Sequence, residues 1–221
     1  MSKDGRTWLS HTSLEVLERC PRCFWLQVNK GIRQPEGIVS RLANRFDVVL
    51  KNYFDKYRKL GIFPPMVEGK LDGHLQNPFV EKYFVRINDK FGFFGKLDEC
   101  LVDDEGRFTP VDFKTSSSDP RDKEILSAYR SQIDDYVFLI SENGRKVTGE
   151  GYLIYFFPDM SEELHDGFPM IVHMQKLEGN PDNTRKRIEN AIKVLSDNIP
   201  NSNPECVFCN YINLVKVAGK N

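Results

Sequence analysis

The 221-residue chain has no apolar run near the ~18 residues that a membrane-spanning helix needs. Its first residues, MSKDGRTWLSHTS, lack the apolar stretch of a secretory signal, so we expect a cytoplasmic protein with no membrane partner. Net charge is also small, −1 from 31 basic and 32 acidic residues, so a nucleic-acid partner would have to be held by local basic patches. Neither a Walker loop nor a dinucleotide fingerprint is present, which argues against an ATP-driven motor.

Histidine is scarce as well, and its four positions show neither metal-ligand nor catalytic-triad spacing. Aromatic residues are plentiful, with 16 Phe and 8 Tyr, enough apolar area for a substantial core. Residues 37–61 are predicted to form an amphipathic helix, whose apolar positions recur at helical spacing: Leu42, Phe46, Val49, Tyr53 and Tyr57. Further helices are predicted over 9–20, 122–144 and 183–199, and strands over 79–87, 91–102, 107–115, 151–157 and 170–177.

This order of elements predicts an α/β fold with a mixed central β-sheet flanked by helices, because strands alternate with helices and the hairpins are antiparallel. We expect a single domain over 1–221. Within it, the motifs described next lie in 80–140, and the segments 10–30 and 200–212 carry paired cysteines.

Two aspartates and a lysine stand out on the hairpin around the loop 104–106. A three-residue loop with Gly106 in the left-handed position would place Asp98 opposite Asp112, with Cβ atoms about 5 Å apart. Lys114 shares a face with Asp112, because side chains alternate along a strand. A four-residue loop would instead put the two aspartates on opposite faces. Pro110 also weakens the pairing, since it cannot donate to the ladder.

Two carboxylates this close repel each other unless a positive charge lies between them. Mg²⁺ needs only one or two carboxylates together with waters and substrate phosphates, and a bound metal activates water and stabilises charge on a phosphate. Lys114 is suited to position the nucleophilic water. The pattern therefore favours metal-assisted phosphodiester hydrolysis. The alternative is that Asp98 and Asp112 are exposed strand residues with incidental charges.

The helix after the hairpin carries Gln132 and Tyr136, which are neighbours at i and i+4 on an otherwise apolar face. We expect both to lie over the site and to donate hydrogen bonds to a nucleic-acid backbone. The alternative is a core stripe with a glutamine at its edge.

Three motifs now follow one another: G-x-x-D (Gly95, Asp98), D-x-K (Asp112, Lys114) and Q-x-x-x-Y (Gln132, Tyr136). Their order and spacing resemble the PD-(D/E)xK nuclease superfamily, and most closely its RecB-like exonucleases, which include CRISPR adaptation-associated and AddB-type nuclease domains.

The resemblance implies a restriction-endonuclease-like fold and Mg²⁺- or Mn²⁺-dependent DNA cleavage. By the same resemblance Asp98, Asp112 and the Phe113 carbonyl bind the metal, and Lys114 is catalytic. Relatives often place a histidine ligand on the preceding helix. No histidine lies there in this chain, and Asp47 is the expected substitute, the alternative being a solvated helix residue.

Four of the five cysteines form two C-x-x-C pairs, Cys20 with Cys23 and Cys206 with Cys209. In a cytosolic chain such pairs suggest metal binding or redox chemistry before disulfides, and a shared metal would tie the two ends of the chain together. The RecB-like exonucleases commonly carry a [4Fe-4S] cluster on one N-terminal and three C-terminal cysteines, and by this resemblance we expect such a cluster here, although this chain has two and two. Zn²⁺ is the alternative, since paired C-x-x-C is equally a zinc pattern. Four unrelated thiols are a further alternative. Cys100 is expected to be a buried strand residue.

We therefore expect a metal-dependent deoxyribonuclease of RecB-like exonuclease type, acting on single-stranded DNA or duplex ends in DNA repair, recombination or defence. The resemblance leaves room for a helicase or another protein that delivers the substrate. Two alternatives stay open: a catalytically inactive DNA-binding protein on the same scaffold, and a zinc-stapled domain with no nucleic-acid role.

Overall fold

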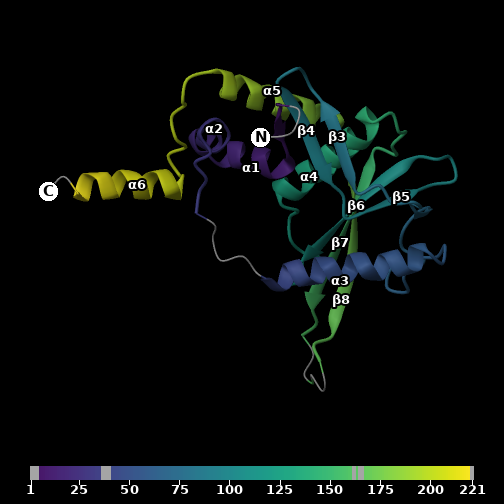
Figure 1. Cartoon of the computed structure of the whole chain (residues 1–221). Helices are drawn as coiled ribbons and strands as arrows, with labels where there is room; N and C mark the ends of the chain where they lie inside the picture. The colour runs from purple at the N-terminus through teal and green to yellow at the C-terminus, as the bar shows by residue number, and fades with distance from the viewer. Residues whose placement is uncertain (1–4, 36–40, 161–162, 164–166, 220–221) are drawn as a thin grey trace. The chain divides into compact units, whose positions relative to one another are not determined.

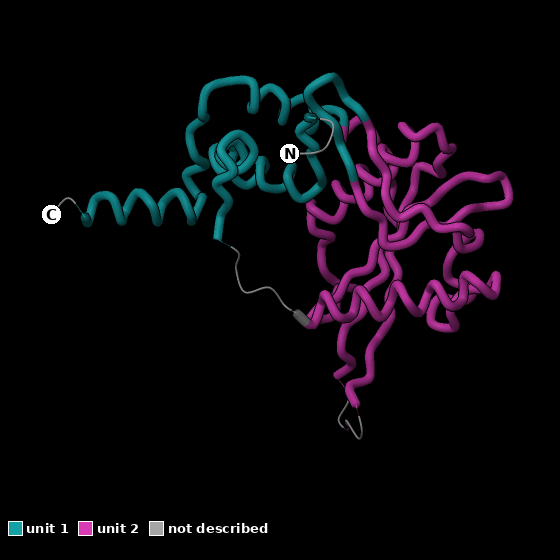
Figure 2. Tube along the Cα trace, in the orientation of Figure 1, with its two compact units in different colours: residues 1–39, 86–94, 185–221 teal, residues 40–85, 95–184 magenta. Residues whose placement is uncertain are grey.

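The structure is a computed structural model that describes residues 5–35, 41–160, 163 and 167–219. The chain divides into two compact units (Figure 2). Unit 1 comprises residues 1–39, 86–94 and 185–221, and unit 2 comprises residues 40–85 and 95–184. The paired cysteines belong to unit 1, whereas the three motifs around Asp98, Asp112 and Gln132 belong to unit 2. The expectation of a single domain stays a prediction.

Unit 1 is mainly helical. Ser10 caps the first helix: its hydroxyl accepts the Ser13 N–H, and the Ser13 hydroxyl accepts the Ser10 N–H. The second helix is fastened to the end of the fifth, because the indole N–H of Trp25 donates to the Asp197 carbonyl at 3.0 Å. The elements of this unit, with β4 ending and α5 beginning in unit 2, are β1 (Thr7–Leu9), α1 (His11–Arg19), α2 (Pro21–Lys30), β4 (Phe91–Lys96), α5 (Pro181–Ser196) and α6 (Val207–Ala218).

Strand β1 pairs in parallel with β4 (Phe91–Lys96), and strand β3 spans Lys82–Arg86. The single strand expected over 91–102 is broken in the structure, and β5 begins only at Glu99. The break has a physical cause. The Leu97 N–H donates to the Glu81 carbonyl at 2.8 Å, and the Asp98 carboxylate accepts the Phe113 N–H that a continuous strand would have paired.

Unit 2 is built around a five-stranded sheet of order β2-β5-β6-β7-β8 (Figure 1). Strands β6 and β7 pair in parallel and the other neighbours are antiparallel, so the predicted mixed sheet is confirmed. The strands are β2 (His74–Leu75), β5 (Glu99–Val102), β6 (Phe108–Thr115), β7 (Glu150–Pro158) and β8 (Met170–Glu178).

One helix covers each face of this sheet. Leu50 and Phe54 of α3 (Arg41–Arg58) pack in one cluster with Val111. Helix α4 (Ser127–Glu142) lies on the other face, where a Cβ placed on Gly151 would come within 2.7 Å of Ile133. Because neighbouring strand residues point to opposite faces, residues 111 and 113 point toward α3 and residues 112 and 114 toward α4.

The buried face of α3 differs from the predicted one. Leu42 and Val49 are 65% and 48% exposed, whereas Leu50, Phe54 and Arg58 are buried. The buried positions recur every four residues, so the helix turns a different stripe toward the sheet than the one marked by its aromatic residues. Tyr53 and Tyr57 pack only partly against the core. The first four residues of the predicted helix, 37–40, lie outside the described residues.

A charged pair is buried between α3 and the sheet, which the hydrophobic pattern does not indicate. Arg58 donates to both carboxylate oxygens of Glu99, at 3.0 and 2.6 Å, and to the Gln76 carbonyl at 2.7 Å. Arg58 is 5% exposed and Glu99 only 1%. This pair fixes the C-terminal end of α3 against β5, one residue after Asp98. None of the helices within the described ranges is both long and apolar enough to cross a membrane.

Candidate active site and candidate metal centre

The hairpin between β5 and β6 has the register that the sequence predicts. Glu99 pairs with Val111 and Val102 with Phe108, and Asp98 lies immediately before this ladder. The loop closes as expected, since Gly106 has a φ of 73°. Pro110 does not disturb the ladder. Its partner is Cys100, whose carbonyl accepts the Gln76 N–H on the side away from β6. Cys100 and Pro110 are therefore a pair that forms no hydrogen bond between β5 and β6, so the missing N–H of Pro110 leaves no gap in the ladder.

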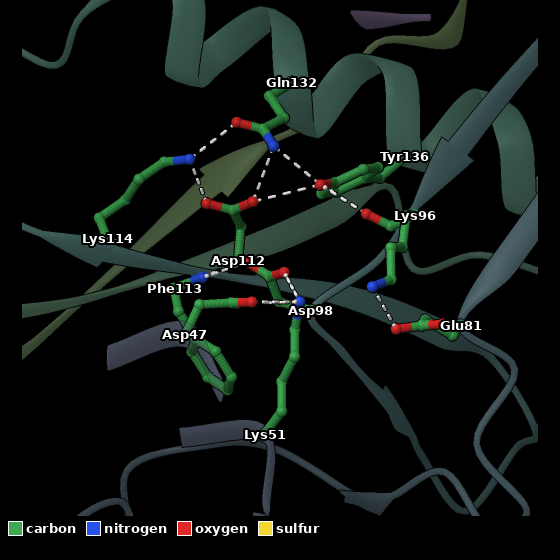
Figure 3. A network of polar contacts seen from close by, with 10 residues as sticks. All are labelled: Asp47, Lys51, Glu81, Lys96, Asp98, Asp112, Phe113, Lys114, Gln132 and Tyr136. Atoms are coloured by element: carbon green, nitrogen blue, oxygen red, sulfur yellow. Dashed lines mark hydrogen bonds and ion pairs between the residues drawn. The ribbon is translucent and has the colours of Figure 1, made fainter. Parts of the chain in front are cut away.

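Asp112 lies at the centre of a polar network on the α4 face of the sheet (Figure 3). Its Oδ1 accepts hydrogen bonds from the Gln132 amide at 2.8 Å and from the Tyr136 hydroxyl at 3.2 Å. Among the described residues, the ammonium of Lys114 is the only partner of Oδ2. Lys114 in turn donates to the Gln132 Oε1 at 2.7 Å and lies 4.5 Å from the centre of the Tyr129 ring.

The electrostatics of Asp112 follow from its burial, since only 1% of the residue is exposed. Desolvation raises the pKa of Asp112 to about 6, with Lys114 opposing the rise and Asp98 adding to it. Burial and the nearby carboxylates also raise the pKa of Tyr136, so its hydroxyl stays protonated and donates. Asp112 is therefore a carboxylate that gains from any further positive charge placed beside it.

Asp98 lies at the break between β4 and β5, toward the side of α3. Its Oδ2 accepts the Phe113 N–H at 3.0 Å, and its Oδ1 contacts the ammonium of Lys51 at 2.8 Å. The same ammonium lies 2.9 Å from Asp47, four residues earlier on α3 (Figure 3). Burial would lower the pKa of Lys51, but the two carboxylates outweigh it and raise the pKa.

The donor set suits a hard divalent cation. One oxygen of each carboxylate is fixed by neutral donors, and the other, Oδ2 of Asp112 and Oδ1 of Asp98, meets only an ammonium among the described groups. In a strand the N–H and C=O of one residue point to the same edge. Because the Phe113 N–H points to Asp98, the Phe113 carbonyl points to that edge too, which adds a third oxygen of the type that Mg²⁺ prefers.

The structure brings Asp112, Lys114, Gln132 and Tyr136 together in one network. Asp98 lies beside this network, and its partners are the Phe113 N–H and Lys51, so its expected convergence with Asp112 on one cation stays a prediction. The Gln132 amide and the Tyr136 hydroxyl donate to Asp112 instead of facing outward. The Tyr136 hydroxyl oxygen also lies 3.1 Å from the Lys96 carbonyl oxygen. Their expected contact with a nucleic-acid backbone stays a prediction.

Sequence reasoning missed Lys51 altogether. The available signal was its spacing, because Asp47 and Lys51 are at i and i+4 on a helix and such pairs are neighbours. Asp47 reaches Asp98 only through this lysine, so its role as a metal ligand stays a prediction.

Gly95, the first residue of G-x-x-D, has a steric role. A Cβ at this position would lie 2.4 Å from the Leu139 Cδ1, and Leu139 is fully buried in α4. The absence of a side chain allows α4 to approach the end of β4. That approach brings Tyr136, on the same helix face, to the Lys96 carbonyl.

The four paired cysteines cluster in unit 1, as predicted. Their Sγ atoms all lie within 4.8 Å of one another, and all four residues are buried and free of disulfides. This is a group able to bind a metal. Cys100 is fully buried on β5, and burial raises the pKa of its thiol to about 12, which agrees with its expected role as a small apolar residue.

The sequence that contains these residues was compared with known protein families and structures. The family model of the PD-(D/E)XK nuclease superfamily matches residues 52–214. The chain belongs to this superfamily. The matched range contains all three motifs and the second cysteine pair, whereas Asp47, Lys51 and the first cysteine pair precede it.

Superfamily membership agrees with the mixed sheet flanked by helices, and PD-(D/E)XK nucleases use divalent metals. Eighteen chains of solved structures match this one. Among them, the crystal structure of SSO0001 is 17% identical, covers 95% of this chain and 85% of its own length, and has a TM-score of 0.49. The search among curated proteins found no match.

Proposed function

We propose that the protein is a Mg²⁺- or Mn²⁺-dependent deoxyribonuclease whose site is the network around Asp112 in unit 2. The observation that carries this proposal is that the two oxygens of each carboxylate, on Asp98 and on Asp112, have different partners. Neutral donors hold Oδ1 of Asp112 and Oδ2 of Asp98, which leaves one oxygen on each residue for a cation. These two oxygens and the Phe113 carbonyl would hold it. When bound, such a cation lowers the pKa of a water molecule and stabilises charge on the phosphate.

The chain's own residues have separate roles in this proposal. Gln132 and Tyr136 fix the orientation of the Asp112 carboxylate. Gln132 also accepts from Lys114, so a single side chain sets the positions of both the carboxylate and the ammonium. Lys114 then supplies a positive charge at a defined place, where it orients the attacking water and offsets charge on the scissile phosphate. Asp47 and Lys51 position Asp98 from the side of α3.

The finer assignment is a RecB-like exonuclease that acts on single-stranded DNA or duplex ends, in DNA repair, recombination or defence. Its support is the order G-x-x-D, D-x-K and Q-x-x-x-Y, together with paired cysteines at both ends of the chain. A helicase or another protein would deliver the substrate, because the chain has no Walker loop of its own.

A cleavage assay tests the proposal. Purified protein is incubated with end-labelled single-stranded DNA, linear duplex and closed circular DNA, in Mn²⁺, Mg²⁺ or EDTA. We expect metal-dependent product from the linear substrates, reduced at least about 100-fold by Asp112→Asn or by Lys114→Met. The matched control is Asp104→Asn, the same substitution at the exposed tip of the same hairpin, which should cleave like the parent. Product from closed circles would contradict the exonuclease assignment but leave the nuclease in place.

A second candidate is a DNA-binding protein without catalysis. It is favoured by the lysines themselves, since both cation-facing oxygens are already paired with an ammonium. Binding of the labelled DNA with no product in either metal, at concentrations where the Asp104→Asn control also binds, would support this candidate and refute the nuclease.

A further inference from the structure

We infer that the four cysteines of unit 1 hold a single Zn²⁺ ion, and that they do not hold an iron–sulfur cluster. The inference rests on the separations of the sulfur atoms. Sγ of Cys23 lies 3.6 Å from that of Cys209 and 3.7 Å from that of Cys206, and Sγ of Cys20 lies 3.9 Å from that of Cys209. Four thiolates around one zinc at 2.3 Å lie about 3.8 Å apart, because the site is tetrahedral.

An iron–sulfur cluster needs a wider set of ligands. In a [4Fe-4S] cluster each cysteine binds a different iron, so the thiolate sulfurs stand on the order of 6 Å apart. Here all four Sγ atoms lie within 4.8 Å of one another, so the cube of iron and sulfide does not fit between them. A [2Fe-2S] cluster fails for the same reason, because it separates its ligands into two distant pairs. The [4Fe-4S] cluster expected from the resemblance therefore does not match the donor set.

The backbone around the cysteines repeats the same arrangement twice. Cys20 is the N-cap of α2 and Cys23 lies in its first turn, and Cys206 and Cys209 have the same positions on α6. Both helices therefore direct their N-terminal ends toward the sulfur cluster. The partial positive charge of a helix N-terminus favours anions, and a zinc ion with four thiolates has a net charge of −2. Each C-x-x-C pair thus lies at the N-terminus of one helix, and the two helix N-termini together favour this anionic centre.

The zinc ion would be structural. Four protein ligands fill its coordination sphere, which leaves no position for a water or a substrate. Its ligands come from chain segments up to 189 residues apart, so metal binding closes a long loop and fixes α2 against α6. Asn203, which donates to the Arg19 carbonyl at 3.0 Å, supports the same junction from the second segment. The inference concerns unit 1 residues only, so it stands or falls independently of DNA cleavage.

The test is the metal content of the full-length protein, purified without oxygen from cells grown with both iron and zinc. We expect a colourless protein with about one zinc ion per chain, and a zinc X-ray absorption spectrum of four sulfurs at about 2.3 Å. Cys23→Ser and Cys209→Ser should lose the zinc. Cys100→Ala is the matched control and should retain it, because this buried thiol is not part of the cluster.

Three outcomes would overturn the inference: a brown protein with several irons and acid-labile sulfide per chain, a single iron in place of zinc, or metal-free thiols that react at once with a thiol reagent. Should the serine variants fail to fold, cobalt substitution in the parent chain still decides. Co²⁺ bound by four thiolates gives intense tetrahedral d–d absorption, and a weak octahedral spectrum would count against the site.

Discussion

Replacing Arg58 by methionine tests the buried pair that joins α3 to the sheet. The substitution keeps most of the side-chain volume but removes both hydrogen bonds to Glu99, at 3.0 and 2.6 Å, and the bond to the Gln76 carbonyl. Glu99 is left 1% exposed, with the Cys100 N–H at 2.8 Å as its remaining hydrogen-bond donor among the described residues. Breaking a buried pair in this way costs about 3–5 kcal/mol, because it leaves one charge without compensation.

The cost should depend on pH in a defined direction. Burial raises the pKa of Glu99 and Arg58 opposes the rise, so the pKa rises further when Arg58 is removed. Below the unfolded-state pKa both states carry a neutral Glu99, and the variant loses only packing and hydrogen bonds. Between the unfolded and folded values the native state binds the extra proton, so stability falls by about 1.4 kcal/mol per pH unit as pH rises. The penalty of Arg58→Met is therefore smallest in acid and largest near neutrality.

The assay is urea unfolding followed by far-UV circular dichroism at several pH values. Tryptophan fluorescence is unsuitable, because Trp8 and Trp25 both belong to unit 1. The matched control is Asp55→Ala, which removes the 3.0 Å contact to the same guanidinium from a carboxylate that is 53% exposed. That loss should be about 0–1 kcal/mol.

The double variant Arg58→Met/Glu99→Gln should recover part of the loss, since the buried charge is gone. A penalty for Arg58→Met below about 1 kcal/mol, or one that is independent of pH, would refute the reasoning. Either result would mean that Glu99 is not a buried, charged partner in the folded protein.

Two further predictions concern the candidate active site. Because burial raises the pKa of the metal-free Asp112 to about 6, the apparent Mn²⁺ affinity should weaken as pH drops below that value, since the proton and the cation compete for the same carboxylate. Cleavage at subsaturating Mn²⁺ should therefore show an acid limb, and a rate at low Mn²⁺ that does not change with pH would contradict this. Gln132→Leu should weaken the apparent Mn²⁺ affinity about 10–100-fold, because Asp112 and Lys114 both lose a partner; an unchanged Mn²⁺ titration would show that Gln132 does not position them.

The hairpin was predictable because its determinants are local. Gly106 in the left-handed region fixes the loop length, and the loop length fixes every pair from Val102 with Phe108 down to Glu99 with Val111. The alternation of side chains then assigns Asp112 and Lys114 to one face. The mixed sheet followed for a similar reason, since hairpins and a helical crossover each dictate how adjacent strands run.

Helix α3 shows where such reasoning ends. Its aromatic and aliphatic residues allow two apolar stripes, and the sequence does not say which faces the sheet. In the structure, the stripe that faces the sheet contains Leu50, Phe54 and Arg58, and Arg58 pairs there with Glu99, 41 positions away in the sequence. Lys51 was missed for the same reason, because a lysine on an exposed-looking helix face gives no sign that two carboxylates will surround it.

The same tertiary contacts explain how the site keeps three carboxylates close together. Asp47, Asp98 and Asp112 would repel one another, and two ammonium groups, from Lys51 and Lys114, offset most of that charge. Each ammonium sits on a flexible stem, whereas the neutral donors to Asp98 and Asp112 come from a strand backbone and from α4. In the proposed nuclease, a cation would therefore displace the lysines without moving the carboxylates. The rigid donors on one oxygen keep each carboxylate in place, and the mobile ammonium on the other oxygen balances its charge until the proposed cation binds.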